Sequence, residues 1–396
     1  MKPFSGIRVL DLTHVLAGPF SAYQLAIMGA DVIKIESPDH PDVARPVGSV
    51  QHLNRKGMGT SFLTQNSNKR AITLNLKTER GKELFRELSA SADVIVENYR
   101  AGAIEALGLG YSEIAELNPS IIYCSMTGFG QTGPKRGHTA YDNVIQAISG
   151  LMTTTGHVGS SSPLKVGPPI LDYFSGTMAA FSIASALFQR MKTGRGQRID
   201  VSMMDSAVML MAWTVTDFLN GGGAPRIWGN DSDNAGYSCY DTADGLLMVG
   251  AEAPSQQRRM WKMLGRDDLA VDQTFEQVLS KRDEHAPILA EIFRRKTADQ
   301  WALEFHDAGL PAERVRTLEE ALAHDQLSHR SVLHKLGKIA ALDQEVTVPV
   351  TAFTFAADGP EITSPPPFHG EHTDEVLREF GYQDVDMFAL RRDGVI

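Results

Sequence analysis

The sequence predicts an α/β protein in which a doubly wound parallel sheet forms a large domain and a smaller α+β domain follows it. Two observations carry this prediction. Short apolar segments alternate with amphipathic ones over roughly the first 150 residues, as strands and helices do around a parallel sheet. The composition then changes at the run from Gly221 to Pro225, which is typical of a linker between domains.

The N-terminal segment reads as a strand–helix–strand unit. Residues 7–12 (IRVLDL) read as a buried strand, and Pro19 suits the first turn of a helix that ends before Gly29. Residues 31–36 (DVIKIE) form the next strand, so the two strands are expected to be parallel. The turn between strand and helix reads HVLAGP and lacks the G-x-G-x-x-G of dinucleotide-binding folds, which argues against an NAD enzyme.

The same alternation continues toward the middle of the chain. We expect strands at residues 71–76, 93–96 and 121–126, and helices at 79–88, at 104–117 with a break at 108–110, and at 140–151. Ligands of doubly wound sheets bind at the carboxyl ends of the strands. The loops that follow strands, 14–18, 98–100 and 128–137, are therefore the candidate functional segments.

Asp172 is the acid on which the functional interpretation depends. It follows a Gly-Pro-Pro turn and precedes Gly176 and a helix of almost only small and apolar residues, which predicts a helix buried on all sides. Arg190 and Gly194 suit the end of that helix, and residues 198–202 alternate like a strand. On spacing alone, Asp172 is more often a helix cap than a nucleophile held against an apolar wall.

The domain boundaries follow from these elements. We expect a large domain at residues 1–220, completed by a returning segment at 330–396, and a small domain at 226–325. The small domain is predicted to hold strands at 237–241 and 245–250 and helices near 255–264, 284–295 and 298–308. Strands at 333–339 and 345–350 and a final helix at 373–380 follow, and this tail is expected to return to the large domain or to reach a second subunit.

The bulk composition excludes several classes of function. The 396 residues are 42% hydrophobic, and their net charge of -10 argues against nucleic acid or an anionic membrane as the main partner. The first residues lack the continuous apolar stretch of a signal peptide, so none is expected, and we expect no membrane span because no window approaches the roughly 18 apolar residues that one needs. Two cysteines, Cys124 and Cys239, make a disulfide framework implausible and point to a reducing, cytoplasmic location. No metal site is expected.

Several stretches, in order and over nearly the whole chain, resemble the class III coenzyme A transferases, the family of formyl-CoA transferase and the carnitine and bile-acid CoA transferases (CaiB/BaiF type). The stretches are GIRVLDLTHVLAGPFSAYQLAIMGADVIKIE (residues 6–36), NKR (68–70), VIVENYRAG (94–102), SMTGFGQTGP (125–134), YDNVIQAISGLM (141–152), KTGRGQRIDVSMMDS (192–206) and GEHTDEVL (370–377). The resemblance implies an interlocked homodimer that uses coenzyme A as substrate and binds no cofactor tightly.

The resemblance also implies site residues. Asp172 is the expected nucleophile, which forms a mixed anhydride and then an aspartyl-CoA thioester. An oxyanion and acyl pocket is implied at His14, Val15, Leu16, Ala17, Gly18, Tyr141 and Asp142. Contacts to coenzyme A are implied at Arg45, Lys69, Arg70, Asn98, Tyr99, Arg100 and Lys135. Leu16 stands where formyl-CoA transferase has a Gln, which disfavours formate and oxalate as substrates. Pro38 stands where that enzyme has a phosphate-facing Arg, so the basic role is expected to pass to Arg45, Lys69, Arg70 or Arg100.

Two alternatives stay open beside transfer of CoA to a carboxylic acid, for which a dicarboxylate such as succinate is the family's suggestion. The first is an α-methylacyl-CoA racemase on the same fold, which needs a histidine and an aspartate as acid and base. Tyr141 stands at that histidine's position, and a tyrosine is a poor base near neutral pH. The second is a non-catalytic acyl-CoA-binding protein, against which the retained Asp172 argues.

Overall fold

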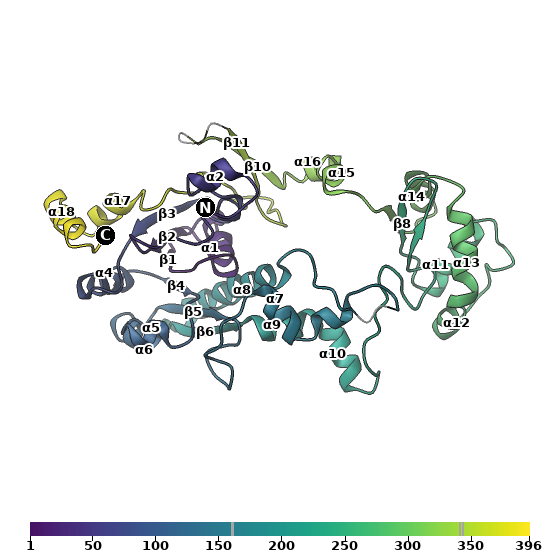
Figure 1. Cartoon of the computed structure of the whole chain (residues 1–396), viewed down its shortest axis with the longest axis horizontal. Helices are drawn as coiled ribbons and strands as arrows, with labels where there is room; N and C mark the ends of the chain where they lie inside the picture. Colours follow the sequence, from purple (N-terminus) through teal and green to yellow (C-terminus); the bar gives the residue numbers. More distant parts are fainter. Residues whose placement is uncertain (160–161, 340–341, 343) are drawn as a thin grey trace. The chain divides into compact units, whose positions relative to one another are not determined.

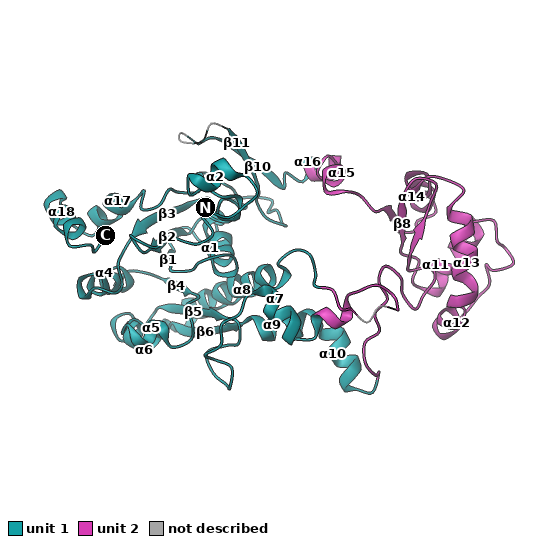
Figure 2. Ribbon diagram, viewed as in Figure 1, with its two compact units in different colours: residues 1–151, 165–221, 328–396 teal, residues 152–164, 222–327 magenta. Residues whose placement is uncertain are grey.

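A computed structural model describes residues 1–159, 162–339, 342 and 344–396 (Figure 1). The chain divides into two compact units (Figure 2). Unit 1 contains residues 1–151, 165–221 and 328–396, and unit 2 contains residues 152–164 and 222–327. The sequence-based boundaries differ from these mainly at residues 152–164, which interrupt the large domain and belong to the small one.

Unit 1 is built on a six-stranded parallel sheet, which confirms the sheet predicted from the alternation of strands and helices. The strands are β1 (Arg8–Asp11), β2 (Asp31–Glu36), β3 (Lys69–Thr73), β4 (Val94–Glu97), β5 (Ile122–Thr127) and β6 (Gln197–Ser202). Their order in the sheet is β3-β2-β1-β4-β5-β6. From β1 the chain adds strands on one side up to β3, and it then crosses to the other side of β1 to add β4, β5 and β6. In doubly wound sheets this switch point is where ligands bind.

Apolar residues cover both faces of the sheet, because successive side chains of a strand point to opposite sides. Val9 and Val94 pack against α1 (Ala17–Ile27) and α8 (Ile170–Thr193). On the other face, Leu10 and Ile95 pack against a second layer of helices. That layer consists of α4 (Glu79–Ala90), α5 (Ala103–Ala106), α6 (Tyr111–Leu117), α17 (Thr373–Glu379) and α18 (Asp384–Arg392).

The C-terminal segment returns to unit 1 along the edge strand β3 (Figure 1). The backbone N–H of His372 donates to the Ala71 carbonyl at 2.8 Å, and that of Asn75 donates to the Val395 carbonyl at 2.7 Å. The predicted last helix is present as α17, but α18 follows it, so the expectation of a single final helix was wrong. The hairpin of β10 (Leu333–Lys338) and β11 (Glu345–Pro349) precedes them.

The other described helices of unit 1 are α2 (Gln51–Arg55), α3 (Thr60–Leu63), α7 (Asp142–Ile148), α9 (Met203–Leu210) and α10 (Ala212–Leu219). A short 3-10 helix, Leu151–Thr154, begins at the last residue of this part of unit 1 and continues into unit 2. Unit 2 holds an antiparallel sheet of β7 (Cys239–Asp241), β8 (Leu246–Val249) and β9 (Ala312–Arg314). Its helices are α11 (Pro254–Met263), α12 (Phe275–Ser280), α13 (Arg282–Phe293) and α14 (Ala298–Asp307), and α15 (Leu318–Leu322) and α16 (Asp325–His329) follow. Trp261, Phe293 and Trp301 lie in its core.

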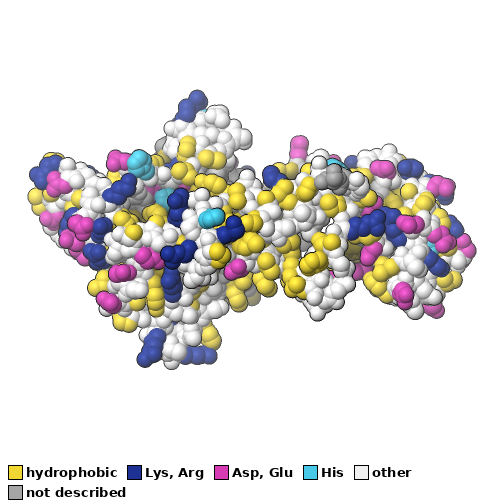
Figure 3. Space-filling model, turned by 60° about the horizontal axis from the view of Figure 1, so that its bottom comes forward, with side chains coloured by type: hydrophobic (Ala, Val, Ile, Leu, Met, Phe, Trp, Pro, Cys, Tyr) yellow, Lys and Arg dark blue, Asp and Glu magenta, His cyan; other side chains and the backbone are white. Residues whose placement is uncertain are grey.

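Helix α8 corrects two expectations from the sequence. It is not buried on all sides: Ala179 and Ile183 pack into the core, whereas Phe181 is 66% exposed. By length and composition it is also apolar enough to cross a membrane, with 39% of its most apolar window buried. Trp213 of α10 is 84% exposed as well. Figure 3 shows exposed hydrophobic side chains between charged ones on the face that it draws.

Candidate active site

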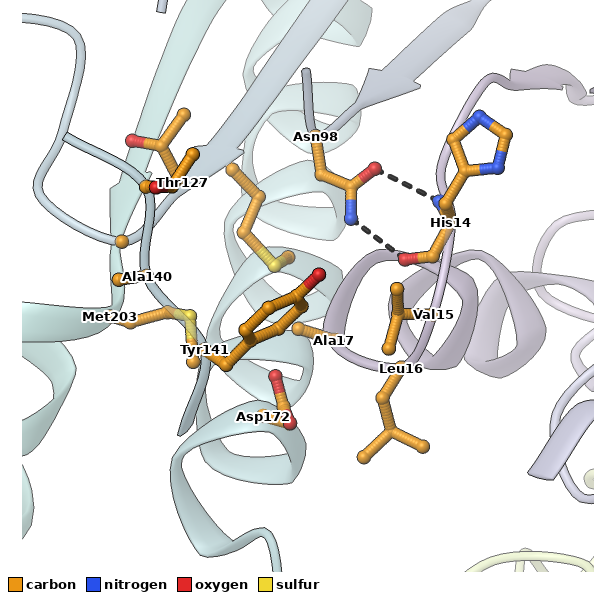
Figure 4. Close-up of a pocket in the computed structure, with 13 residues that line it drawn as sticks. His14, Val15, Leu16, Ala17, Asn98, Thr127, Ala140, Tyr141, Asp172 and Met203 are labelled. Atoms are coloured by element: carbon orange, nitrogen blue, oxygen red, sulfur yellow. Dashed lines mark hydrogen bonds between the residues drawn. The ribbon is translucent and has the colours of Figure 1, made fainter. Parts of the chain in front are cut away.

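Asp172 lies in the first turn of α8 and faces a cavity of about 360 Å³ within unit 1. The cavity opens at the carboxyl ends of β1, β4 and β5, beside the switch point of the sheet. Its lining residues are His14, Val15, Leu16, Ala17, Asn98, Met126, Thr127, Gly128, Thr139, Ala140, Tyr141, Asp172 and Met203 (Figure 4). The structure therefore brings most of the expected oxyanion and acyl pocket together around the expected nucleophile.

Asp142, not Asp172, caps helix α8. One carboxylate oxygen of Asp142 accepts the backbone N–H groups of Leu171 at 2.7 Å and of Asp172 at 3.3 Å. The other oxygen accepts from the Gln146 amide at 2.5 Å, which fixes the carboxylate on α7. Within the described residues, no hydrogen bond or ion pair engages the Asp172 carboxylate. The helix-cap interpretation of Asp172 is thus wrong, and its side chain is available to a ligand.

The surroundings of Asp172 make its carboxylate unusually basic. Burial, and secondarily the negative charge of Asp142, raise the pKa of Asp172 to about 7. A poorly solvated carboxylate without a counter-charge is a better nucleophile than one held in a salt bridge. The site therefore holds an acid that is ready to attack an electrophilic carbonyl once it loses its proton.

The loop between β1 and α1 forms the opposite wall of the cavity. Asn98, at the end of β4, accepts the His14 N–H at 2.9 Å and donates to the His14 carbonyl at 2.8 Å (Figure 4). Burial lowers the pKa of His14, whose ring stays neutral at pH 7 and packs edge-on against Tyr99 at 5.9 Å between centroids. Asn98 thereby ties the two strands together at the switch point.

The helix α1 directs its N-terminus at this cavity. No hydrogen bond among the described residues uses the backbone N–H groups of Leu16, Ala17 or Gly18, as expected for the first turn of a helix. The N–H groups of His14 and Val15 are already occupied by Asn98 and Asp42. The five oxyanion donors expected from the sequence therefore reduce to three, at the positive end of the α1 dipole.

The cationic residues expected at coenzyme A are mostly engaged elsewhere. The Arg45 guanidinium makes two hydrogen bonds to Glu36, at 2.8 Å and 2.6 Å, and Lys69 pairs with Asp11 at 2.8 Å. Both cations are buried, and the carboxylate that pairs with each one neutralises its charge inside the fold. The structure does not place Arg45 or Lys69 at the cavity.

Arg70 likewise serves the fold: it binds Asp31 and the C-terminal helix residues Glu375 and Glu379. Arg100 and Lys135 are exposed on the loops after β4 and β5, and Lys135 lies 5.7 Å from the Phe129 ring centroid. Of the expected cations, only Arg100 and Lys135 are exposed, whereas Arg70 is partly buried by its ion pairs.

A second cavity, of about 370 Å³, adjoins the first at His14. It lies at the carboxyl ends of β2, β3 and β4, and its lining includes Tyr99, His40 and Lys77. His40 and Lys77 were missed in the sequence. Lys77 directly follows the strand expected at 71–76, so the strand-end rule that selected loops 14–18 and 98–100 would also have found it.

Comparison with known proteins gives consistent results. The model of CoA-transferase family III matches residues 4–373. Mouse succinyl-CoA:glutarate CoA-transferase is 34% identical, over 100% of this chain and 91% of that protein. Succinate–glutarate CoA-transferase of Agrobacterium fabrum is 34% identical, over 95% of each chain. The crystal structure of a CAIB/BAIF family protein from Brucella suis superimposes with a TM-score of 0.81 at 32% identity, covering 96% of this chain and 99% of that one.

Proposed function

The chain belongs to CoA-transferase family III and is a CoA-transferase, and we propose that it moves coenzyme A between an acyl-CoA and a carboxylic acid through covalent intermediates on Asp172. One observation carries the covalent mechanism. Asp142 takes over the capping of α8, and this leaves the Asp172 carboxylate without a partner among the described residues, in the cavity that the N-terminus of α1 also faces. A screen of acyl-CoA donors against carboxylic acids, read by mass spectrometry, tests the transfer reaction.

The chemistry explains why a carboxylate is needed. Exchange of one thioester for another is nearly neutral in free energy, so the enzyme must conserve the activated bond. Attack of an Asp172 oxygen on the thioester carbon breaks the C–S bond and gives a mixed anhydride and a CoA thiolate. The thiolate then attacks the aspartyl carbonyl, which releases the donor acid and leaves an aspartyl-CoA thioester. The acceptor carboxylate repeats both steps in reverse, and Asp172 is regenerated.

Each of these steps passes through a tetrahedral oxyanion. The free N–H groups of Leu16, Ala17 and Gly18 are the donors that we assign to it, and removal of one such donor typically costs about a hundredfold or more in rate. Val15, Met126 and Met203 give the cavity an apolar lining. This lining limits the access of water, which would hydrolyse the anhydride.

The pH dependence follows from the raised pKa of Asp172. Only the ionised carboxylate attacks, so kcat/KM is expected to rise with pH along a limb centred near pH 7, where the pKa of Asp172 lies. A carboxyl group of ordinary pKa, 3.8, would give a rate that is constant across this range. A pH profile of kcat/KM, from about pH 5 to 9, checks this, and a profile flat down to pH 5 would contradict it.

We place coenzyme A across the two adjoining cavities. Its thiol end reaches Asp172 in the first cavity, and its phosphates lie in the second, near Lys77. The exposed Arg100 follows Tyr99, which lines the second cavity. The neutral ring of His14 lines both cavities, at the point where the pantetheine arm passes.

Lys77→Ala is expected to weaken CoA binding about tenfold, because one charge-assisted contact to phosphate is lost. The kcat should change little, since Lys77 lies far along the ligand from the reacting atoms. Calorimetric titration of CoA checks this, with Lys82→Ala as the matched control, because Lys82 pairs with Glu79 on the surface of α4. If Lys77→Ala and the native protein bound CoA with equal affinity, the proposal that the phosphates lie in the second cavity would be wrong.

Relatives that span most of this chain are named for succinyl-CoA with glutarate and, in Haloarcula marismortui, with mesaconate. We therefore assign dicarboxylates to this enzyme, with succinyl-CoA as donor.

The exposed apolar side chains of α8 and α10 are best covered by a second copy of the chain. We therefore propose a cytoplasmic homodimer, and sedimentation equilibrium tests the dimer.

A further inference from the structure

Val15 has an unfavourable backbone conformation at the edge of the active-site cavity. Its φ of 70° lies in the left-handed region, which a β-branched residue rarely adopts. Such a conformation persists only where the surrounding structure holds it, and it gathers at functional sites. At Val15, hydrogen bonds to buried side chains hold this conformation.

Two buried side chains hold the peptide groups on either side of Val15. Asp42 accepts the Val15 N–H at 3.0 Å, and its carboxylate is itself fixed by Lys34 at 2.9 Å. The Gln65 amide donates to the Val15 carbonyl oxygen at 2.7 Å. Gln65, Asp42 and Lys34 are all 0% exposed, so these contacts do not compete with water.

The contact of Gln65 bears directly on one oxyanion donor. The carbonyl of Val15 and the N–H of Leu16 belong to the same peptide plane, and in a trans peptide they point in opposite directions. A hydrogen bond that fixes the carbonyl toward the buried Gln65 therefore turns the Leu16 N–H the other way. Leu16 lines the cavity that contains Asp172, and no described hydrogen bond uses its N–H.

We infer that Gln65 is a positioning residue for the transfer reaction, which aims the Leu16 N–H at the oxyanion formed on Asp172 by donating to the carbonyl of the same peptide. This inference rests on the proposed function. The donated hydrogen bond also polarises the peptide, which makes the Leu16 N–H a stronger donor. Gln65 itself touches no reacting atom.

The test replaces Gln65 by methionine, which has a similar length but donates no hydrogen bond. Gln65→Met is expected to lower kcat about tenfold or more, while the KM for acyl-CoA stays within about twofold, because the oxyanion exists only in the transition state. Gln24→Met makes the same chemical change in α1 away from the cavity, and it is expected to leave kcat unchanged. Thermal unfolding of each variant reports any general loss of stability.

A double variant separates positioning from packing. Glycine adopts a positive φ without strain, so Val15→Gly removes the tendency of the turn to relax when Gln65 is lost. The variant with both Gln65→Met and Val15→Gly is expected to recover part of the lost kcat, a non-additive result. Additive effects, or an unchanged kcat in Gln65→Met, would overturn the inference while native transfer persists. Absence of any transfer by the native chain would instead overturn the proposed function, and this inference with it.

Discussion

Asp172→Asn is expected to abolish CoA transfer, with a loss of more than about a thousandfold in kcat. Asparagine keeps the shape of the side chain, but its amide is a poor nucleophile and forms no anhydride, so neither covalent intermediate can arise. Affinity for CoA should change little, because we propose that the phosphates bind in the second cavity, away from Asp172. Steady-state assays and calorimetric titration check the two halves of this result.

The control for this variant is Asp205→Asn, which changes an exposed aspartate in the first turn of α9. It is expected to retain native activity. Substantial turnover in Asp172→Asn would mean that another group accepts the acyl chain, and the covalent mechanism proposed here would be wrong.

Asp172→Asn should also show how much the ionised Asp172 carboxylate lowers the free energy of unfolding. A pKa raised from 3.8 to about 7 means that the folded protein binds this proton more tightly than the unfolded chain does. The contribution of Asp172 to stability is therefore complete below about pH 4 and is lost as the pH rises through about 7. Asp172→Asn is expected to be more stable than the native protein by about 2–4 kcal/mol at pH 8, and the difference should vanish near pH 4. Chemical denaturation at the two pH values measures it.

Gly176→Ala is expected to lower turnover about a hundredfold, the scale of loss that a displacement of about 1 Å can cause. A Cβ at Gly176 would lie 2.6 Å from the Ala17 carbonyl oxygen and 3.0 Å from Phe20. The first of these neighbours is backbone and cannot rotate away, so α1 and α8 would have to separate. The N–H donors of α1 would then move away from Asp172, one turn from the substitution.

The matched control is Gly167→Ala, since a Cβ there meets no atom within 4 Å and the residue has no positive φ. Crystallography or small-angle scattering confirms that both variants fold, and their kcat values are compared. Native kcat in Gly176→Ala would contradict the claim that close packing of the two helices aligns the donors with the nucleophile.

Most strands of unit 1 could be predicted because they are short segments rich in apolar residues, as in DVIKIE of β2. Strand β3 reads KRAIT and begins two residues before the strand predicted at 71–76. The third strand of unit 2, Ala312–Arg314, reads AER and has no such pattern; its pairing with β8 alone makes it a strand. Helix α8 was recognised from its composition, but which of its sides is exposed depends on packing against α1 and the sheet. The sequence could not show this.

Some residues of the candidate site could likewise be predicted from the sequence, and others could not. Asp172 and the loop of His14 could be found from strand ends and the resemblance to a family. The roles of Arg45 and Lys69 could not, because their partners Glu36 and Asp11 meet them only in the folded sheet. The capping of α8 by Asp142 and the support of Val15 by Gln65 are also contacts between separate elements, and no local pattern signals them.

The most direct measurement is a trapping experiment on the native protein. The enzyme is incubated with acyl-CoA and hydroxylamine, digested, and mapped by mass spectrometry. We expect a hydroxamate on the peptide that carries Asp172, formed only when acyl-CoA is present and absent from Asp172→Asn. Continued turnover with Asp172 unmodified, or a hydroxamate on a different carboxylate, would contradict the assignment of Asp172 as the group that carries the activated bond.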